Sequence, residues 1–593
     1  MLRFARVVPS AATLAVLVAA CSGGADTASD TTAPATRAST AAPVETAVAT
    51  TAPETTAIAS TTTESTLPPP TEQRLVATGP EEMVFDWSED RCDDGTYPDI
   101  APRVVRNAEG LVQLYIGNDT TYRMTGPDLN TLTIDCAATV MTSDYESDPA
   151  QFNDWEWISS TYTPDGQTVY AIVHNEYLGT EHADVLPDQC PSGVTFDCID
   201  VSLTMAISTD GGATYDHAFE PPNHLIATMP YVFDDEGVAS GLWQTSNIVE
   251  GPDGLFYVLV NIATTEATAR DVGVQWVCAM RTADLTDPTS WRFWDGEEFA
   301  GQFVNPYTQD ASDTDVCAPV DFPALQAEMS ESILWDESIE RFVIVGGTHE
   351  LGAQTTWGTY YSTSEDLIDW TPRQLLLENE VPRTVADQAE MTFIAYPTLL
   401  DPDSPSANFA TTDGSMYLYL VRFNAGGVSL DRDLVRIPVA WEEVTYEPTV
   451  WEFDTDGDAP LATGGWTPLF DIGEFEVADG ALSMTSTGND PYMANYALRI
   501  PAQFDTVSIT MAADAVDAGG GQTAAELFFW TDGVDVFDES RLKVFDVIAD
   551  GEMRTYDLDM STVDTWDGFI TALRIDPAGR EQLPITIERI EVS

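Results

Sequence analysis

A dense polar run follows an apolar stretch near residue 170. The segment "TVYAIVHNEY" passes from Ala, Ile and Val directly into His174, Asn175 and Glu176. A carboxylate and an imidazole can transfer protons, and an amide can hydrogen-bond to a polar substrate. We therefore take Glu176 as a candidate catalytic acid and His174 and Asn175 as candidate substrate-binding residues. An exposed strand end is the alternative explanation for the same run.

Cysteine and histidine limit the disulfides and metal sites that the chain can form. Six cysteines remain after Cys21, an even number that suits disulfide bonds in an oxidising compartment. The nearest-neighbour arrangement, one of about 15 possible, pairs Cys92 with Cys136, Cys190 with Cys198, and Cys278 with Cys317. No CxxC spacing occurs and the five histidines are scattered along the chain, so we expect no zinc site and no cofactor. Calcium is compatible with an acidic exported protein, although "DTDGDAP" is only a weak loop for it.

The elements that must position these residues belong to a repeat. A turn with an acidic residue, clearest in "STSEDLIDW", recurs at spacings of 67 to 82 residues. Asp and Ser side chains in such turns bond to backbone amides, so we expect structural roles for these acids. They are Asp128, Asp210, Asp284, Asp366 and Asp433.

Two strand-like runs precede each acidic turn, and together with the flanking strands every repeat offers four strands. Four-stranded repeats that cannot bury their faces alone stack radially, so five repeats predict an all-β, five-bladed β-propeller over residues 74–449. The pairs of runs are "APRVVRN" and "LVQLYIGN", "WISSTYT" and "TVYAIVHNEY", "SNIVEG" and "LFYVLVNIA", "SILWDE" and "RFVIVGGTH", and "IAYPTLL" and "MYLYLVRF".

The repeat stops near residue 450. Residues 450–593 contain no cysteine, and their length and strand-like runs suit one β-sandwich. The run "WDGFITALRIDP" resembles the closing strands of jelly-roll, galactose-binding-like modules, and this resemblance implies a jelly-roll-like β-sandwich with a carbohydrate-binding role. Trp466, Trp530 and Trp566 could stack on sugar faces, and we expect at most one of them to do so because tryptophan in a small sandwich is usually buried.

The "SxSxDLxxW" turn in "STSEDLIDW", five predicted blades and an appended sandwich resemble the five-bladed glycosidases of the arabinanase, xylosidase and levansucrase type. The resemblance implies three acidic residues on the innermost strands of successive blades, acting as base, pKa-tuning acid and general acid around an axial pocket. When the turn glycine of the first blade is aligned with the family's pattern, Ala101 falls at the position of the base. Asp99 lies two residues earlier on the same strand face, so Asp99 is the candidate base.

The second and third blades supply the other two positions of this resemblance. Glu156 in "FNDWEWISSTY" is the candidate for the pKa-tuning role, with Asp154 as second choice. Gln244 stands where the family has its acid, and because an amide donates no titrating proton we assign Gln244 to substrate binding and Glu176 to the acid role.

Two further polar residues occupy the position of His174 in their own repeats. His349 and Arg422 each lie at the end of the second strand, so the three could line one rim of the axial pocket as substrate-binding residues. Structural bonds are the alternative. The segment "STDGGATY" also resembles the Asp-box of sialidases, but a sialidase needs an arginine triad, and only Arg281 and Arg422 are well placed.

The N-terminus carries export signals. Arg3 and Arg6 precede the apolar run "AATLAVLVAA", as in a signal peptide, and "LVAAC" resembles the bacterial lipoprotein box. The resemblance implies a lipoprotein signal peptide over residues 1–20 and lipidation of Cys21. Residues 21–73 are rich in Thr, Ala and Pro and predict a disordered stalk. We therefore expect an exported protein that is lipid-anchored to the outer face of a bacterial cell membrane.

The charge excludes some partners. Ninety-eight acidic residues against 24 basic ones give a net charge of −74, which disfavours nucleic acid and leaves the lipid anchor as the membrane contact. We expect a monomeric, glycoside hydrolase-like protein that acts on or binds extracellular polysaccharide or oligosaccharide through the axial pocket. The alternative is a noncatalytic glycan-binding or adhesion lipoprotein that kept the scaffold and lost the acid.

Overall fold

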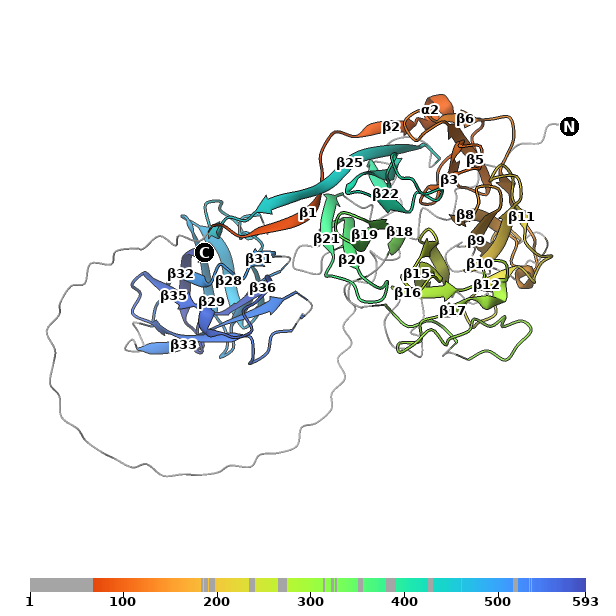
Figure 1. The fold of residues 1–593 in the computed structure, drawn as a ribbon. Helices are drawn as coiled ribbons and strands as arrows, with labels where there is room; N and C mark the ends of the chain where they lie inside the picture. The colour runs from red at the N-terminus through yellow and green to blue at the C-terminus, as the bar shows by residue number, and fades with distance from the viewer. Residues whose placement is uncertain are drawn as a thin grey trace, which may run out of the picture.

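The computed structural model describes residues 68–593, apart from 183–184, 186–189, 191–192, 194–197, 234–239, 265–274, 313–314, 321–324, 326–327, 350–355, 380–390, 425–429, 460, 497, 516–520, 533 and 535. The predicted signal peptide, Cys21 and most of the predicted stalk lie outside these residues. The fold is nearly all β (Figure 1). Its helices within the described residues are short: α2 (Trp87–Asp90), η2 (Pro149–Gln151), η4 (Pro288–Ser290) and η6 (Met560–Thr562). None of the helices in this part of the chain combines the length and apolar character needed to cross a membrane.

The strands up to residue 445 form five consecutive units. Unit one contains β3 (Arg103–Arg106), β4 (Val112–Ile116), β5 (Thr120–Gly126), β6 (Thr133–Asp135) and β7 (Met141–Thr142). Unit two contains β8 (Trp155–Tyr162), β9 (Val169–Leu178), β10 (Ile199–Ser208), β11 (Asp216–His217) and β12 (Leu225–Ala227). Unit three contains β13 (Ser240–Thr245), β14 (Val249–Glu250), β15 (Phe256–Thr264), β16 (Gln275–Thr282) and β17 (Arg292–Phe293).

Units four and five complete this series. Unit four contains β18 (Glu328–Asp336), β19 (Arg341–His349), β20 (Trp357–Ser364) and β21 (Gln374–Glu378), with β23 (Thr411–Thr412) beside β18. Unit five contains β22 (Phe393–Leu400), β24 (Ser415–Phe423), β25 (Arg432–Thr445), β1 (Thr71–Ala77) and β2 (Glu82–Phe85). The successive strands within each unit pair antiparallel, whereas a short parallel pairing of β10 with β13 joins units two and three into one sheet.

Unit five joins the two ends of this series. The strand β1 pairs with β25 from Thr71 opposite Thr445 to Ala77 opposite Val439. In Figure 1 these two strands run side by side from the five units toward the C-terminal sheets. Because β1 begins at Thr71, the regular structure starts slightly before residue 74, where we expected the stalk to end.

The strand-like runs of the repeat form strands as predicted, with one exception. The run "SNIVEG" of unit three contains only the two-residue strand β14, and the first strand of that unit is β13, a few residues earlier. The pairing of β13 with β15 shifts register between Leu242 and Thr245, which interrupts what would otherwise be one longer strand.

Four of the five predicted acidic residues, Asp128, Asp210, Asp284 and Asp366, bond to backbone amides in turns as we predicted. Asp433 is the exception, because it lies within β25 and accepts from the distant Trp87 N–H at 2.9 Å. Asp366 Oδ1 accepts hydrogen bonds from the backbone N–H groups of Ile368 and Asp369, both at 2.9 Å. Asp210 likewise accepts from the backbone of Ala213 and Thr214 at 3.0 Å. These carboxylates therefore fasten turns between strands.

Two six-stranded sheets follow residue 448. The first contains β26 (Thr449–Glu452), β28 (Ile472–Ala478), β29 (Ala481–Ser486), β32 (Thr506–Ala513), β35 (Arg554–Asp559) and β37 (Pro584–Val592). The second contains β27 (Thr467–Phe470), β30 (Tyr492–Asn495), β31 (Ile500–Pro501), β33 (Gln522–Thr531), β34 (Leu542–Ile548) and β36 (Phe569–Asp576).

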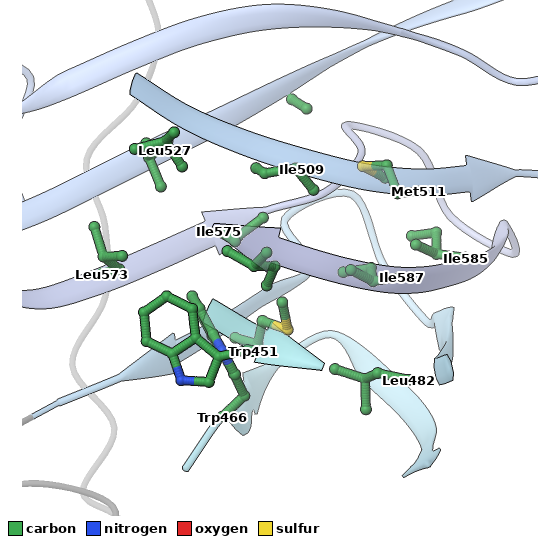
Figure 2. Close-up of a cluster of buried hydrophobic side chains, with 14 of the residues drawn as sticks. Trp451, Trp466, Leu482, Ile509, Met511, Leu527, Leu573, Ile575, Ile585 and Ile587 are labelled. Atoms are coloured by element: carbon green, nitrogen blue, oxygen red, sulfur yellow. The ribbon is translucent and has the colours of Figure 1, made fainter. Parts of the chain in front are cut away.

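Both C-terminal sheets contribute to one hydrophobic cluster (Figure 2). Ile509 of β32 and Leu527 of β33 are fully buried in it, and Trp451 and Trp466 lie with their ring centroids 5.5 Å apart. The alternation of buried and partly exposed residues along β33 gives this strand an inner and an outer face. Trp466 and Trp566 are both buried in the cluster, which leaves Trp530 as the partly exposed member of the three predicted tryptophans.

The three disulfide pairings expected from nearest neighbours are present. Cys92 is bonded to Cys136, Cys190 to Cys198, and Cys278 to Cys317.

Candidate functional site

Arg103, the first residue of β3, lies where the first strands of the five units converge. Its guanidinium donates to the carbonyl oxygens of Ser159 at 2.6 Å, Thr245 at 2.6 Å and Glu331 at 2.8 Å, and to Thr398 Oγ1 at 3.5 Å. These partners belong to β8, β13, β18 and β22. Burial lowers the pKa of Arg103 to about 9. A guanidinium thus occupies the centre around which we expected substrate to bind.

Asp99, the candidate base, lies next to this centre in a buried ion pair. Arg432 donates to its carboxylate, and neither side chain is exposed to solvent. The guanidinium of Arg432 also lies 4.8 Å from the ring centroid of Tyr97 and 4.5 Å from that of Phe423. Burial opposes the charge of Arg432, but the neighbouring Asp99 carboxylate outweighs it and raises the pKa of Arg432. The geometry thus presents Asp99 to an arginine rather than to solvent.

His174 and Glu176, at the end of β9, form a second buried pair. His174 Nε2 lies 2.9 Å from Glu176 Oε1, and Nδ1 lies 2.6 Å from the carbonyl oxygen of Trp243. Because a carbonyl can only accept, Nδ1 donates to Trp243. Glu176 Oε2 is buried without a hydrogen-bond partner. The structure thus brings the candidate acid Glu176 into direct contact with His174.

Asn175 and Asp154 are both held by hydrogen bonds to other groups of the protein. Asn175 Oδ1 accepts from the backbone N–H of Asp154 at 2.7 Å, and its Nδ2 donates to Ser202 Oγ at 2.9 Å. Asp154 Oδ2 accepts from the Leu178 N–H at 3.0 Å and lies 2.8 Å from His182 Nε2. Burial raises the pKa of Asp154, an effect that the bond to His182 partly offsets. The amide of Asn175 is thus engaged by protein groups rather than directed at a ligand.

Glu156, the candidate for the pKa-tuning role, bonds to a histidine that the sequence analysis did not single out. Its Oε1 lies 2.7 Å from His217 Nε2, and its Oε2 is buried without a partner. His224 follows, with its ring centroid 4.6 Å from that of His217. One ligand atom from each of Glu156, His217 and His224 lies within 4.8 Å of the others, which makes this the group of described residues able to hold a metal ion.

The remaining predicted pocket residues do not form one group. Gln244 lies on β13 with its Oε1 buried and unpartnered. Arg422 is bonded to Glu81 and, at 2.8 Å, to Asp433 Oδ2, so its charge is already paired. His349 ends β19, and its side chain lies outside the described residues. Arg281 donates to Asp253 at 3.0 Å, so its charge is also paired within the protein.

The outer face of the second C-terminal sheet carries a row of partly exposed aromatic side chains. Phe528 and Trp530 alternate along β33 with the buried Leu527 and Phe529, so they point away from the hydrophobic cluster. On the far side of β36 in the same sheet, β27 and β30 bring a stacked pair of rings, Phe470 and Tyr492, with centroids 5.9 Å apart. We call this set the aromatic platform: Phe470, Tyr492, Phe528 and Trp530.

One arginine lies between the rings of the aromatic platform. The Arg574 guanidinium is 3.6 Å from the ring centroid of Tyr492 and 4.8 Å from that of Phe528. Asp576 accepts from Arg574 Nε at 2.7 Å and from Nη2 at 2.6 Å, a two-point contact that fixes the guanidinium plane. Burial raises the pKa of Asp576, and Arg574 opposes that shift. Rings, a fixed cation and a carboxylate therefore share one surface.

Sequence reasoning missed Arg103, Arg432, His217 and His224. The two arginines are the first residues of β3 and β25, whose sequences look like ordinary repeat segments, and their partners lie far away in the chain. The histidines lie in and just before short strands on the far edge of β10, where no motif marks them. The available signal was their closeness in a chain with only five histidines.

Comparisons with known proteins give weak likenesses. No protein-family model matches the chain, and no curated protein matches it. A protein of unknown function from Dyadobacter fermentans is 11% identical with a TM-score of 0.35, over 62% of this chain and 99% of that one. A glycoside hydrolase family 43 arabinoxylan arabinofuranohydrolase from Bacillus subtilis is 10% identical with a TM-score of 0.32, over 86% and 98%. A variant of a family 29 carbohydrate-binding module is 12% identical with a TM-score of 0.17, over 24% and 91%. TM-scores this low do not establish a shared fold.

Proposed function

We propose that this chain is a carbohydrate-binding protein and that the aromatic platform holds a segment of polysaccharide. The observation that carries the proposal is the combination of flat rings with the fixed Arg574–Asp576 pair on one sheet face. Sugar rings present apolar C–H faces that stack on aromatic side chains, and their hydroxyl groups accept from guanidinium and donate to carboxylate.

The architecture that we propose is a five-bladed β-propeller over residues 74–449 followed by a β-sandwich over 450–593. The convergence of four other units on the guanidinium of Arg103 supports a radial arrangement of five blades. The single hydrophobic cluster between two six-stranded sheets supports the sandwich.

The state of the propeller carboxylates favours binding over hydrolysis. Glycosidases of this type need two carboxyl groups that flank one glycosidic oxygen. Asp99 is paired with Arg432 without solvent exposure, and Glu156 is bonded to His217. Gln244 stands at the position where the resembling family has its acid. Each of these three positions lacks an accessible, free carboxyl group.

Glycoside hydrolysis is the second candidate function, and one observation favours it. Glu176 keeps one carboxylate oxygen without a partner, and its other oxygen lies 2.9 Å from His174 Nε2. Such a pair can deliver a proton to a leaving oxygen. Release of reducing sugar that is lost in Glu176→Gln would support this second function.

Binding can be tested by affinity electrophoresis and calorimetry of the full chain against soluble plant, algal and bacterial polysaccharides. Trp530→Ala and Arg574→Ala are each expected to weaken binding by up to about tenfold, the equivalent of one ring contact. Tyr556→Ala is the matched control, because Tyr556 is a partly exposed aromatic residue on β35 of the other sheet. Equal binding by the unmodified chain and the three variants would contradict a glycan-binding role for the aromatic platform. Cleavage of a bound glycan would favour hydrolysis over binding as the function of the chain.

We also propose that the chain is exported and anchored by lipid at Cys21, with residues 21–73 as a stalk. The resemblance of "LVAAC" to the lipoprotein box supports this localisation. Cys21→Ser should move the protein from the membrane fraction to the soluble exported fraction of a bacterial host. Retention of the variant on membranes would contradict the anchor.

A further inference from the structure

Three metal-binding side chains from separate elements of unit two meet at one place. Glu156 belongs to β8, His217 to β11, and His224 to the turn that precedes β12. The backbone fixes both ends of this arrangement, because Glu156 N–H donates to Ser143 Oγ at 2.8 Å and the His224 carbonyl accepts from Met205 N–H at 2.8 Å. The side chains therefore cannot move apart without a change in the strands that carry them.

Several polar atoms at this place have no partner within the protein. Glu156 Oε2 and both ring nitrogens of His224 are buried and make no hydrogen bond of normal geometry, although the Phe152 backbone acts on the His224 ring electrostatically. Neither Glu156 nor His224 exposes more than 1% of its surface. Burying such a group without a partner is unfavourable. An orphaned carboxylate oxygen and an orphaned imidazole, in a group whose ligand atoms lie within 4.8 Å of one another, are the pattern expected of a site that binds a cation.

We propose that Glu156, His217 and His224 bind a divalent transition-metal ion of the Zn²⁺ class. Two imidazoles and one carboxylate are a donor set that such ions prefer, and bonds of about 2.0–2.2 Å would place the ligand atoms roughly 3.4 Å apart. Because the three ligand atoms already lie within 4.8 Å of one another, small side-chain rotations complete the site. Three protein ligands leave the fourth position of a tetrahedral ion open.

The surroundings of the three side chains suit this ion. Asp144 Oδ2 lies 3.9 Å from His217 Nδ1. A carboxylate behind the second ring nitrogen is the usual support for a metal-bound histidine. Asp144 is largely exposed and His217 is partly so, which places the entry to the site on their side.

The donor set also separates this site from a calcium site. Calcium takes six to eight oxygen ligands, whereas two of the three donors here are imidazole nitrogens. The scattered histidines of the sequence are in fact concentrated by the fold, because His174, His182, His217 and His224 all belong to β9, β10, β11 or the connections between β9 and β12. His174 and His182 each face a carboxylate without a second imidazole, and they fall outside the group.

The experiment uses the full chain, stripped with a chelator and then titrated separately with ZnCl₂, CoCl₂ and CaCl₂. We expect one equivalent of zinc by elemental analysis, a visible absorption band of protein-bound Co²⁺, and a rise in Tm of several degrees with Zn²⁺. His217→Ala should reduce zinc affinity by at least tenfold. His224→Phe should abolish it without lowering the Tm of the metal-free protein, because the substitution removes two buried, unpartnered nitrogens.

His182→Gln is the matched control, since His182 bonds to Asp154 in the same unit and is outside the proposed group. The control variant should keep the zinc stoichiometry and the Co²⁺ band. Because Cys21 is unchanged in every variant, metal binding by its thiol cannot explain a difference between them. The proposal is overturned if zinc does not bind, if His217→Ala and His224→Phe respond to zinc as the unmodified chain does, or if Ca²⁺ alone stabilises the protein.

Discussion

Asp99 and Arg432 form an ion pair in which neither side chain touches solvent, although the two residues belong to different ends of the five-unit series. Breaking a buried pair by removing one partner leaves an uncompensated charge and costs about 3–5 kcal/mol. We therefore expect Asp99→Ala to lower the free energy of unfolding by this amount in urea titrations.

The double variant Asp99→Leu/Arg432→Met separates charge from packing. Because it removes both charges, it should restore much of the stability that Asp99→Ala loses. If Asp99→Ala instead keeps full stability and eliminates a glycan-cleaving activity, then Asp99 is a catalytic base and its burial does not prevent that role.

The disulfides should differ in their contribution to stability. In the chain-entropy model a bond that closes a longer loop restricts the unfolded chain more. Removing Cys278–Cys317, which spans 39 residues, should cost about 4 kcal/mol. Removing Cys190–Cys198, which spans 8 residues, should cost about 2.5 kcal/mol. Thermal unfolding of the Cys278→Ala/Cys317→Ala and Cys190→Ala/Cys198→Ala proteins checks the order, which would be wrong if the short loop proved the more important.

Asp200 on β10 should make stability depend on pH. Its Oδ1 is buried without a partner, and burial raises its pKa to about 7, against an ordinary value near 3.9. The folded state therefore binds the extra proton between about pH 4 and 7, so this residue destabilises the fold progressively as the pH rises through that window. The full effect amounts to about 4 kcal/mol.

Asp200→Asn should remove this pH dependence. The variant should therefore exceed the unmodified chain in stability by more at pH 8 than at pH 5. Urea titrations at the two pH values provide the measurement. The exposed Asp546→Asn serves as a control for the lost negative charge alone. A stability profile of Asp200→Asn that parallels that of the unmodified chain would show that Asp200 is not the responsible group.

Arg499 should hold the C-terminal sheets to unit five. Its guanidinium bonds to Glu72 of β1, at 3.0 Å from Nε and by a second contact from Nη2, and lies 3.8 Å from the ring centroid of Phe569. Tyr446 also donates to Glu72, at 2.6 Å. Arg499→Ala should thus increase protease cleavage between residues 445 and 449 several-fold.

The control for this substitution is Arg589→Ala. Arg589 bonds to Glu452 and Glu591, both within one C-terminal sheet, so its loss should leave cleavage between 445 and 449 unchanged. If both variants are cleaved alike, the contact of Arg499 with Glu72 does not restrain the connection.

Local chemistry explains which features the sequence could predict. Asp366 and Asp210 bond to amides within four residues, and each disulfide joins two cysteines that are consecutive in the order of cysteines along the chain. The acidic turns and the disulfide pairings could therefore be predicted from the spacing of residues in the sequence. Strand periodicity likewise located most of the units. Such features depend on a short stretch of chain and little else.

The candidate site depended on contacts that no short stretch contains. The partner of Asp99 is more than 300 residues away, and Glu156 on β8 meets histidines from the segments that pair with β10. The resemblance placed Asp99, Glu156 and Gln244 at the starts of strands but carried no information on whether these side chains would be accessible. Burial and pairing of that kind are set by the packing of whole sheets.

The pairing of β1 with β25 has a mechanical consequence. Everything N-terminal to Thr71 is attached to the five units through a ladder that runs from Thr71–Thr445 to Ala77–Val439. A pulling force applied at the N-terminus reaches the molecule through this ladder before it reaches any other strand. We therefore expect the pairing of β1 with β25 to break first under such a force. Unit five would then lose its outermost strand, while Arg103 would keep its bonds to the four other units.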